Sequence, residues 1–187
     1  MSIREKFFGG DHPDVATSVN NLAILYREQG RFAEAELLHA RSLAIRENSL
    51  EGNHPDIGQS LNNLALLFRS QSRFAEAESL LERALAIREL SLGSNHPDFA
   101  TSLNNLALVY TDQDRFSEAE PLFERSLAIR EISLGGDHPR VAKSLENLAL
   151  LRRKQGRDIE AEDLEARARE LRARHGARYR LRAGGLD

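Results

Sequence analysis

Four of the six histidines in this chain recur at a fixed interval, and histidine is the residue type best suited to acid–base or metal chemistry near neutral pH. His12, His54, His96 and His138 lie 42 residues apart, and each is followed by proline. Equivalent side chains in neighbouring helical units, which pack about 8–10 Å apart, cannot share one metal ion. Proline suits the first position of a helix and favours the preceding residue as its N-cap, so these histidines predict helix starts. The chain has no cysteine, and we expect no metal site, no cofactor and no enzymatic activity.

Paired asparagines recur at the same interval and carry a different chemistry, because a carboxamide both donates and accepts hydrogen bonds. A ladder of such groups can pair with the backbone of an extended peptide whatever the sequence of that peptide. Helical spacing places the pairs on one face with other polar residues three or four positions away. The resulting candidate peptide-binding residues are Thr17, Asn20, Asn21, Arg27, Gln59, Asn62, Asn63, Arg69, Thr101, Asn104, Asn105, Lys143 and Asn147.

A structural role is the alternative for one asparagine of each pair, above all for the second, at positions 21, 63, 105 and 147. In that role the side chain bonds a neighbouring helix and sets the stacking of the repeats. We expect the first asparagines, Asn20, Asn62 and Asn104, to point into a binding groove.

His39 lies outside the proline pattern and stands where the later repeats have Leu81 and Phe123. We expect a satisfied or half-exposed side chain there rather than a ligand.

The polar patterns belong to a repeat of 42 residues, which indicates stacked supersecondary units rather than one globular core. Residues 54–95 and 96–137 are identical at 27 of 42 positions, so the unit is well defined. Within 54–95, apolar residues at helical spacing predict a first helix that ends near residues 71–73 and a second from about Phe74 to Ser91. Recurring alanines, such as Ala65 and Ala77, mark places where two helices approach closely. No segment alternates with period two, so we expect no strands.

This unit resembles the tetratricopeptide repeat, most closely its 42-residue version in kinesin light chains. The resemblance rests on the HPD opening, the NNLA of residues 62–65 and 104–107, the QSRF and QDRF turns, the AEAE or SEAE segments and the LAIRE ending. It covers residues 12–175 and implies an all-α fold, a right-handed superhelical solenoid of antiparallel helix pairs whose first helices line the concave face. It also implies a non-catalytic scaffold for protein–protein interaction, with a peptide or partner segment bound along that face.

The register of the repeat predicts how the chain is organised. Residues 2–11 align with 44–53, so residues 1–11 form a remnant of a preceding repeat helix. Repeats 1, 2 and 3 span 12–53, 54–95 and 96–137, repeat 4 spans 138–176, and 177–187 form a basic flexible tail. Repeat 4 ends in a polar capping helix, because Asp158, Glu165 and Arg169 replace apolar residues of the earlier repeats.

The ends of the array raise an alternative function, a structural spacer or oligomerisation segment of a larger protein. The remnant, which contains Phe7 and Phe8, is too short to be a stable helix alone and covers only part of the apolar end of the first repeat. We expect an isologous homodimer through this end, since such a pairing closes.

Composition narrows the range of partners. The formal net charge is −3, and the arginines near the C-terminus are diluted by acidic residues, so we expect a protein or peptide partner and no nucleic acid. No apolar run is long enough for a membrane helix or the core of a signal peptide. We therefore expect no membrane association and a cytoplasmic location.

Overall fold

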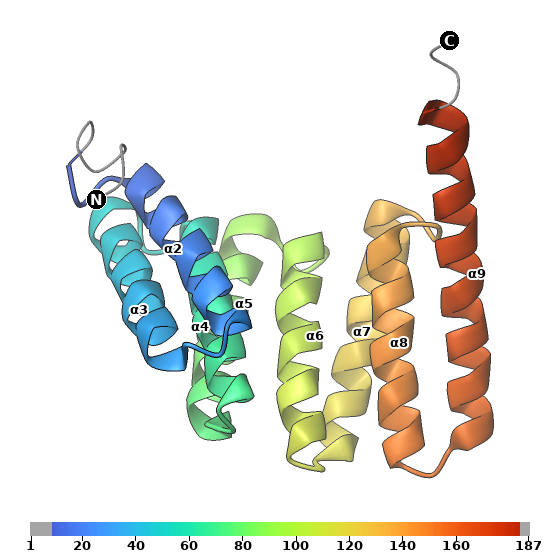
Figure 1. The fold of residues 1–187 in the computed structure, drawn as a ribbon. Coiled ribbons are helices and arrows are strands. Elements are labelled where there is room, and N and C mark those ends of the chain that lie inside the picture. The colour runs from blue at the N-terminus through green and yellow to red at the C-terminus, as the bar shows by residue number, and fades with distance from the viewer. Residues whose placement is uncertain (1–8, 184–187) are drawn as a thin grey trace. The chain divides into compact units, whose positions relative to one another are not determined.

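The computed structural model describes the backbone of residues 9–183 and the side chains of residues 9–175 (Figure 1). This part of the chain is helical and contains no strand, as the sequence predicts. The helices are α2 (Pro13–Glu28), α3 (Phe32–Ser49), α4 (Pro55–Ser70), α5 (Phe74–Leu92), α6 (Pro97–Asp112), α7 (Phe116–Leu134), α8 (Pro139–Lys154) and α9 (Asp158–Ala183).

The chain divides into two compact units, which we call unit 1 (Met1–Ser94) and unit 2 (Asn95–Asp187). Each unit contains two helix pairs, α2–α3 and α4–α5 in unit 1, and α6–α7 and α8–α9 in unit 2. Between the pairs of a unit, the second helix of one packs against the first helix of the next, α3 against α4 and α7 against α8. Each pair corresponds to one of the repeats that the sequence predicts.

Histidine starts the first helix of every pair, which confirms the interpretation of the histidine–proline motif. The Nδ1 atom of His54 accepts a hydrogen bond from the backbone N–H of Asp56, with an N–N distance of 3.2 Å. The same contact measures 3.1 Å at His96 and at His138 and 3.2 Å at His12. With the imidazole acceptor used in this way and proline at the next position, these side chains serve as caps.

The turn inside each pair needs one residue in the left-handed region. Gly30 and Gly156 take it with φ values of 75° and 74°, as predicted for helix stops. Ser72 and Asp114 occupy the same place in the middle repeats, with φ values of 60° and 57°. For residues other than glycine this conformation costs roughly 1 kcal/mol or more.

Small residues and stacking make the core. The recurring alanines are buried at both crossing positions, with Ala65 and Ala77 fully inaccessible. Apolar side chains of one pair also complete the core of the next: Leu43 of α3 and Leu50, which directly follows α3, pack against the cluster of Ile57, Leu61, Ala84 and Ile87. In unit 2, Leu127 of α7 packs in the same way against Val141, Ala142 and Leu145. In each unit, side chains of the first pair therefore complete the core of the second pair.

The chain ends differ in how much can be described. Helix α9 continues to Ala183, past residue 176, where the sequence places the end of the capping repeat. The side chains of the basic tail lie outside the described residues. So do Phe7, Phe8 and the rest of residues 1–8, which form most of the predicted N-terminal remnant.

Candidate peptide-binding surface

The thirteen candidate residues fall into two groups according to their exposure. Six asparagines are buried, with exposed fractions between 2% at Asn62 and 7% at Asn63. These are Asn20, Asn62, Asn63, Asn104, Asn105 and Asn147. Asn21 and Lys143 are exposed, and the half-buried members are Thr17, Arg27, Gln59, Arg69 and Thr101. The two groups therefore differ in environment, and only the side chains of the second group reach the solvent to a larger extent.

In unit 1 two of the buried asparagines, Asn20 and Asn63, belong to a chain of hydrogen bonds that crosses all four helices. Asn63 Nδ2 on α4 donates to Asn20 Oδ1 on α2 at 3.0 Å, and His39 Nδ1 on α3 lies 3.1 Å from the same oxygen. Gln59 Nε2 donates to Asn63 Oδ1 at 3.0 Å, and Gln59 Oε1 accepts from Arg88 Nη2 on α5 at 3.0 Å. We call these five residues the amide ladder of unit 1.

Unit 2 repeats the central contact of this ladder. Asn147 Nδ2 on α8 donates to Asn104 Oδ1 on α6 at 2.9 Å, and Asn104 Nδ2 donates to Asn105 Oδ1 at 3.3 Å. In both units the second asparagine of one repeat reaches the first asparagine of the repeat before it. The bonds match the stacking role that the sequence offers as an alternative for Asn63 and Asn147. They also leave Asn20 and Asn104 with little free amide surface.

A buried arginine from the LAIRE motif joins neighbouring repeats a second time. Arg46 on α3 is 4% exposed, and its Nη1 donates to the backbone oxygen of Asp56 at 2.9 Å and to Ser60 Oγ at 2.8 Å on α4. Its Nη2 donates to Thr17 Oγ1 on α2 at 3.3 Å. Burial lowers the pKa of Arg46, and the nearby negative charge of Asp56 opposes this shift.

Arg130 makes the same set of contacts in unit 2. Its Nη1 donates to Ser144 Oγ at 2.6 Å and its Nη2 to Thr101 Oγ1 at 3.2 Å. Burial, assisted by Arg140, lowers the pKa of Arg130 to about 10, which leaves the guanidinium charged at neutral pH. The sequence pattern did not predict this role; the signal is an arginine that recurs within an apolar stripe. The hydroxyls of Thr17 and Thr101 are thus held by buried arginines.

In the first three pairs, an arginine in the turn stacks on an aromatic ring of the first helix. The guanidinium carbon of Arg73 lies 3.8 Å from the ring centre of Phe68, and Arg115 lies 4.1 Å from that of Tyr110. Arg73 Nη1 also pairs with Glu36 of the preceding repeat at 2.7 Å. These contacts are structural and stand apart from the candidate surface.

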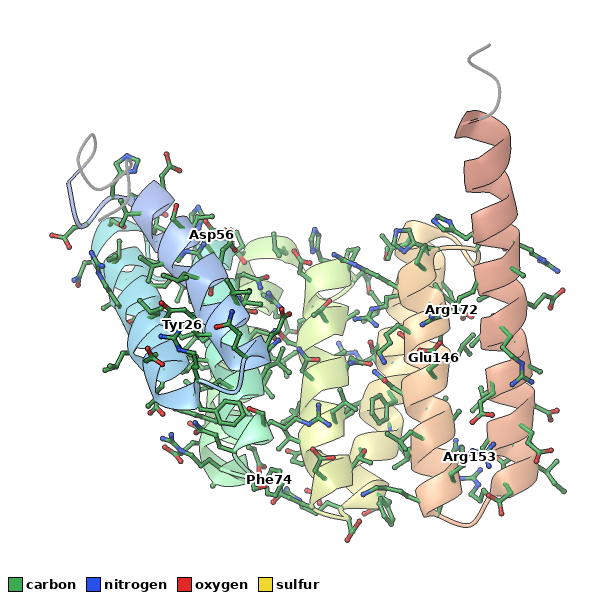
Figure 2. All side chains as sticks on the ribbon, in the orientation of Figure 1. Tyr26, Asp56, Phe74, Glu146, Arg153 and Arg172 are labelled. Carbon is green, nitrogen blue, oxygen red and sulfur yellow. The ribbon has the colours of Figure 1, made fainter. Side chains whose placement is uncertain are left out.

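Lys143 shares its surroundings with a charged pair of the capping repeat. Glu146 on α8 and Arg172 on α9 point toward one another, with 2.7 Å between Glu146 Oε1 and Arg172 Nη2 (Figure 2). Lys143 Nζ lies 3.8 Å from Glu146 Oε2. Glu146 stands at the position of the first asparagine, so in this repeat a carboxylate between two cations takes the place of that amide.

Two kinds of feature are absent from the described residues. No group of three or more histidine, cysteine, aspartate or glutamate side chains in this part of the chain is placed to hold a metal ion. No described helix combines the length and apolar character needed to cross a bilayer.

Comparison with known families places the chain in one of them. One model of the tetratricopeptide repeat matches residues 38–90, 56–132 and 98–174, and a second tetratricopeptide repeat model matches residues 15–56. Together with four successive helix pairs, these matches show that the chain belongs to the tetratricopeptide repeat family and has its all-α solenoid fold.

Solved structures point to the kinesin-light-chain-like type within this family. Two crystal structures of nearly identical TPR-like repeats, from a Podosopora anserina protein described as a kinesin light chain, are 30% and 31% identical to this chain. They cover 94% and 92% of it and 82% of their own chains, with TM-scores of 0.72 and 0.68. BtubC, also called BKLC, from P. vanneervenii is 26% identical over 92% of this chain and 71% of its own, with a TM-score of 0.78. No curated protein matches the sequence.

Proposed function

We propose that this protein is a non-catalytic scaffold that binds an extended peptide or partner segment along the surface of its first helices, α2 and α4 in unit 1 and α6 and α8 in unit 2. Tetratricopeptide repeats generally mediate protein–protein interaction, which supports the general class. The observation that carries the finer proposal is a division of labour along these helices. The buried asparagines recur from repeat to repeat at positions 20, 62 and 104 and at positions 63, 105 and 147, whereas the residues at the more accessible positions change.

The accessible positions vary in chemistry, as a surface that reads side chains requires. Positions 17, 59, 101 and 143 hold threonine, glutamine, threonine and lysine. Arg27 is half-buried and has no carboxylate partner among the described residues, and Asn21 is exposed. These two side chains of α2 can donate to backbone carbonyls of a bound segment, and Asn21 can also accept from its N–H groups.

The test begins with capture of a partner and identification of the bound peptide, followed by titration of that peptide. Asn21→Ala and Arg27→Ala should each weaken the complex by about 2- to 10-fold, the equivalent of one hydrogen bond of roughly 0.5–1.5 kcal/mol. Arg83→Ala, on the second helix α5, is the control, since its exposed side chain pairs with Glu47 at 2.6 Å. Unchanged affinity in both α2 variants would remove the proposed surface.

Asn62→Ala and Asn104→Ala separate binding from stacking. Because both side chains are buried, we expect these variants to lower stability as well as affinity while the protein remains helical. A lost melting transition with no effect on peptide affinity would assign these two asparagines to stacking alone.

A second candidate function, self-association through the N-terminal end, has its own observation. Leu22 and Leu25 on α2 are 40% and 47% exposed, whereas Leu64 and Leu67 at the same positions of α4 are 7% and 0% exposed. The first repeat therefore exposes apolar side chains at positions where the second repeat has them buried. An isologous homodimer that joins two such faces would bury these side chains.

A further inference from the structure

We propose that His39 makes unit 1 acid-sensitive: a second proton on its buried ring opens the α2–α3 pair, whereas unit 2, with Phe123 at the equivalent position, stays closed. This inference does not rest on the proposed function. It rests on where the ring lies, which of its nitrogen atoms has a partner and what surrounds it.

The ring of His39 is fully enclosed, with an exposed fraction of 0%. Its Nδ1 lies 3.1 Å from Asn20 Oδ1, an oxygen that already accepts from Asn63 Nδ2. A carboxamide oxygen only accepts, so the hydrogen-bond network assigns the neutral ring a proton on Nδ1. Nε2 is then the unprotonated atom, and it is buried without a hydrogen-bond partner.

A second proton on Nε2 has nothing to bind in this position. It would add an N–H group and a positive charge to a buried site that offers no acceptor, which is costly. Opening of the pair removes the cost, because the ring then reaches solvent. Since His39 bonds Asn20, its departure also takes away one of the two donors that hold the first asparagine of the ladder.

The charges around the ring oppose protonation further. Helices α2 and α4 pack against α3, and their charged residues are Asp14, Arg27, Glu28, Asp56 and Arg69. Of these, Arg27 acts on the ring, and its charge has the same sign as an imidazolium. On α3 itself, Glu36 lies three residues before His39, but its carboxylate is 2.7 Å from Arg73 Nη1. Burial first and Arg27 second lower the pKa of His39 to about 4.

The direction of the pH effect follows from this depressed pKa. In the open state the ring takes up its proton near pH 6.5, the ordinary value for histidine. The closed state resists protonation down to about pH 4. The stability that unit 1 gains from keeping this ring neutral is therefore fully present above about pH 6.5 and is lost progressively as the pH falls toward 4. Between these limits the ratio of open to closed molecules rises by up to about tenfold per pH unit.

Packing alone does not call for histidine at this position. The equivalent residues Leu81 and Phe123 are buried apolar side chains with exposed fractions of 0% and 1%. Leucine and phenylalanine thus satisfy the same crossing in the repeats that follow. The histidine adds a titratable group where the fold itself accepts a hydrocarbon.

Amide hydrogen exchange measured by mass spectrometry at pH 6.5 and pH 5.0, corrected for intrinsic exchange rates, tests the proposal. In the wild type, protection of α2 and α3 should fall by about tenfold or more, while that of α8 and α9 changes much less. His39→Leu, which has the residue of the equivalent position 81, should abolish the difference in pH response between α2–α3 and α8–α9. The capping histidines are a built-in control, because they occur in both units and are unchanged in the variant.

Two results would overturn the proposal. One is an equal loss of protection with pH in wild type and His39→Leu. The other is an NMR titration in which the His39 ring gains its proton near pH 6.5 while α2 and α3 stay protected. If His39→Leu does not fold, His39→Phe, the counterpart of Phe123, replaces it, and the ring titration of the wild type decides the question without any variant.

Discussion

Replacement of Arg46 by methionine tests whether the buried arginine of the LAIRE motif holds two repeats together. The side chain bridges α3 to Asp56 and Ser60 on α4 and to Thr17 on α2, with donor–acceptor distances of 2.8 to 3.3 Å. Methionine keeps much of the apolar stem and fits irregular space, so the change removes the guanidinium with little loss of packing.

The expected loss of stability is the contribution of the hydrogen bonds that are removed, reduced by the desolvation penalty of the buried charge, which is removed with them. Two short bonds to a charged donor contribute roughly 1.5 kcal/mol each, and the longer one to Thr17 less. Thr17 keeps a partner, since its hydroxyl also donates to the backbone oxygen of Pro13 at 3.3 Å. Relief of the buried charge offsets about 1 kcal/mol of this loss. We therefore expect Arg46→Met to lower the free energy of unfolding of unit 1 by about 2 kcal/mol.

Urea unfolding followed by circular dichroism at about 222 nm measures this difference, with Arg83→Met as the matched control. Arg83 is about half exposed and pairs with Glu47 at 2.6 Å, a contact of the kind that contributes below about 1 kcal/mol. Equal midpoints for Arg46→Met and wild type, or equal losses in the two variants, would refute the reasoning. A gain in stability would mean that the desolvation penalty of the buried guanidinium is larger than the stabilisation from its hydrogen bonds.

Two further predictions concern packing and the N-terminal end. Ala65→Leu should destabilise the protein by roughly 1–3 kcal/mol, because the larger side chain overpacks the crossing between α4 and α5. Ala75→Leu, the same change at an exposed position, should leave the stability unchanged. Coincident melting curves for Ala65→Leu and wild type would place the crossing elsewhere. Replacement of Phe7 and Phe8 by serine should shift a dimer to monomer in size-exclusion chromatography with light scattering, and a wild type that is monomeric at high concentration, or a dimer insensitive to both changes, would rule out the N-terminal homodimer.

Local chemistry in the sequence was enough to predict the helices. Histidine before proline defines a start because of φ restriction and the missing N–H, and the structure begins α4 at Pro55. The second helix was expected from about Phe74 to Ser91, and α5 spans Phe74–Leu92. These features depend only on residues that are close in sequence, so they can be recognised without knowledge of the tertiary structure.

The direction of the polar side chains could not be read in the same way. Helical spacing puts Asn20 and Thr17 on one face, but it does not say whether that face meets solvent or another helix. The partner of Asn20 is Asn63, which lies 43 positions along the chain, and the acceptors of Arg46 come from the next repeat. Only the stacking of one helix pair on the next brings these groups together.

Directional contacts between repeats explain how a nearly uniform apolar core can still fix the register of stacking. Leucine and alanine at equivalent positions would tolerate small slides of one pair along the next, because apolar contacts have little directionality. Asn63 to Asn20 and Arg46 to Ser60 in unit 1, like Asn147 to Asn104 in unit 2, form only at one register, and a slip would leave buried polar groups without partners. In the middle repeats, Asn63 and Asn104, which take part in these contacts, are buried on the first helices α4 and α6. His39 changes this arrangement at one place, because it ties the ladder of unit 1 to a proton equilibrium that Phe123 does not provide in unit 2.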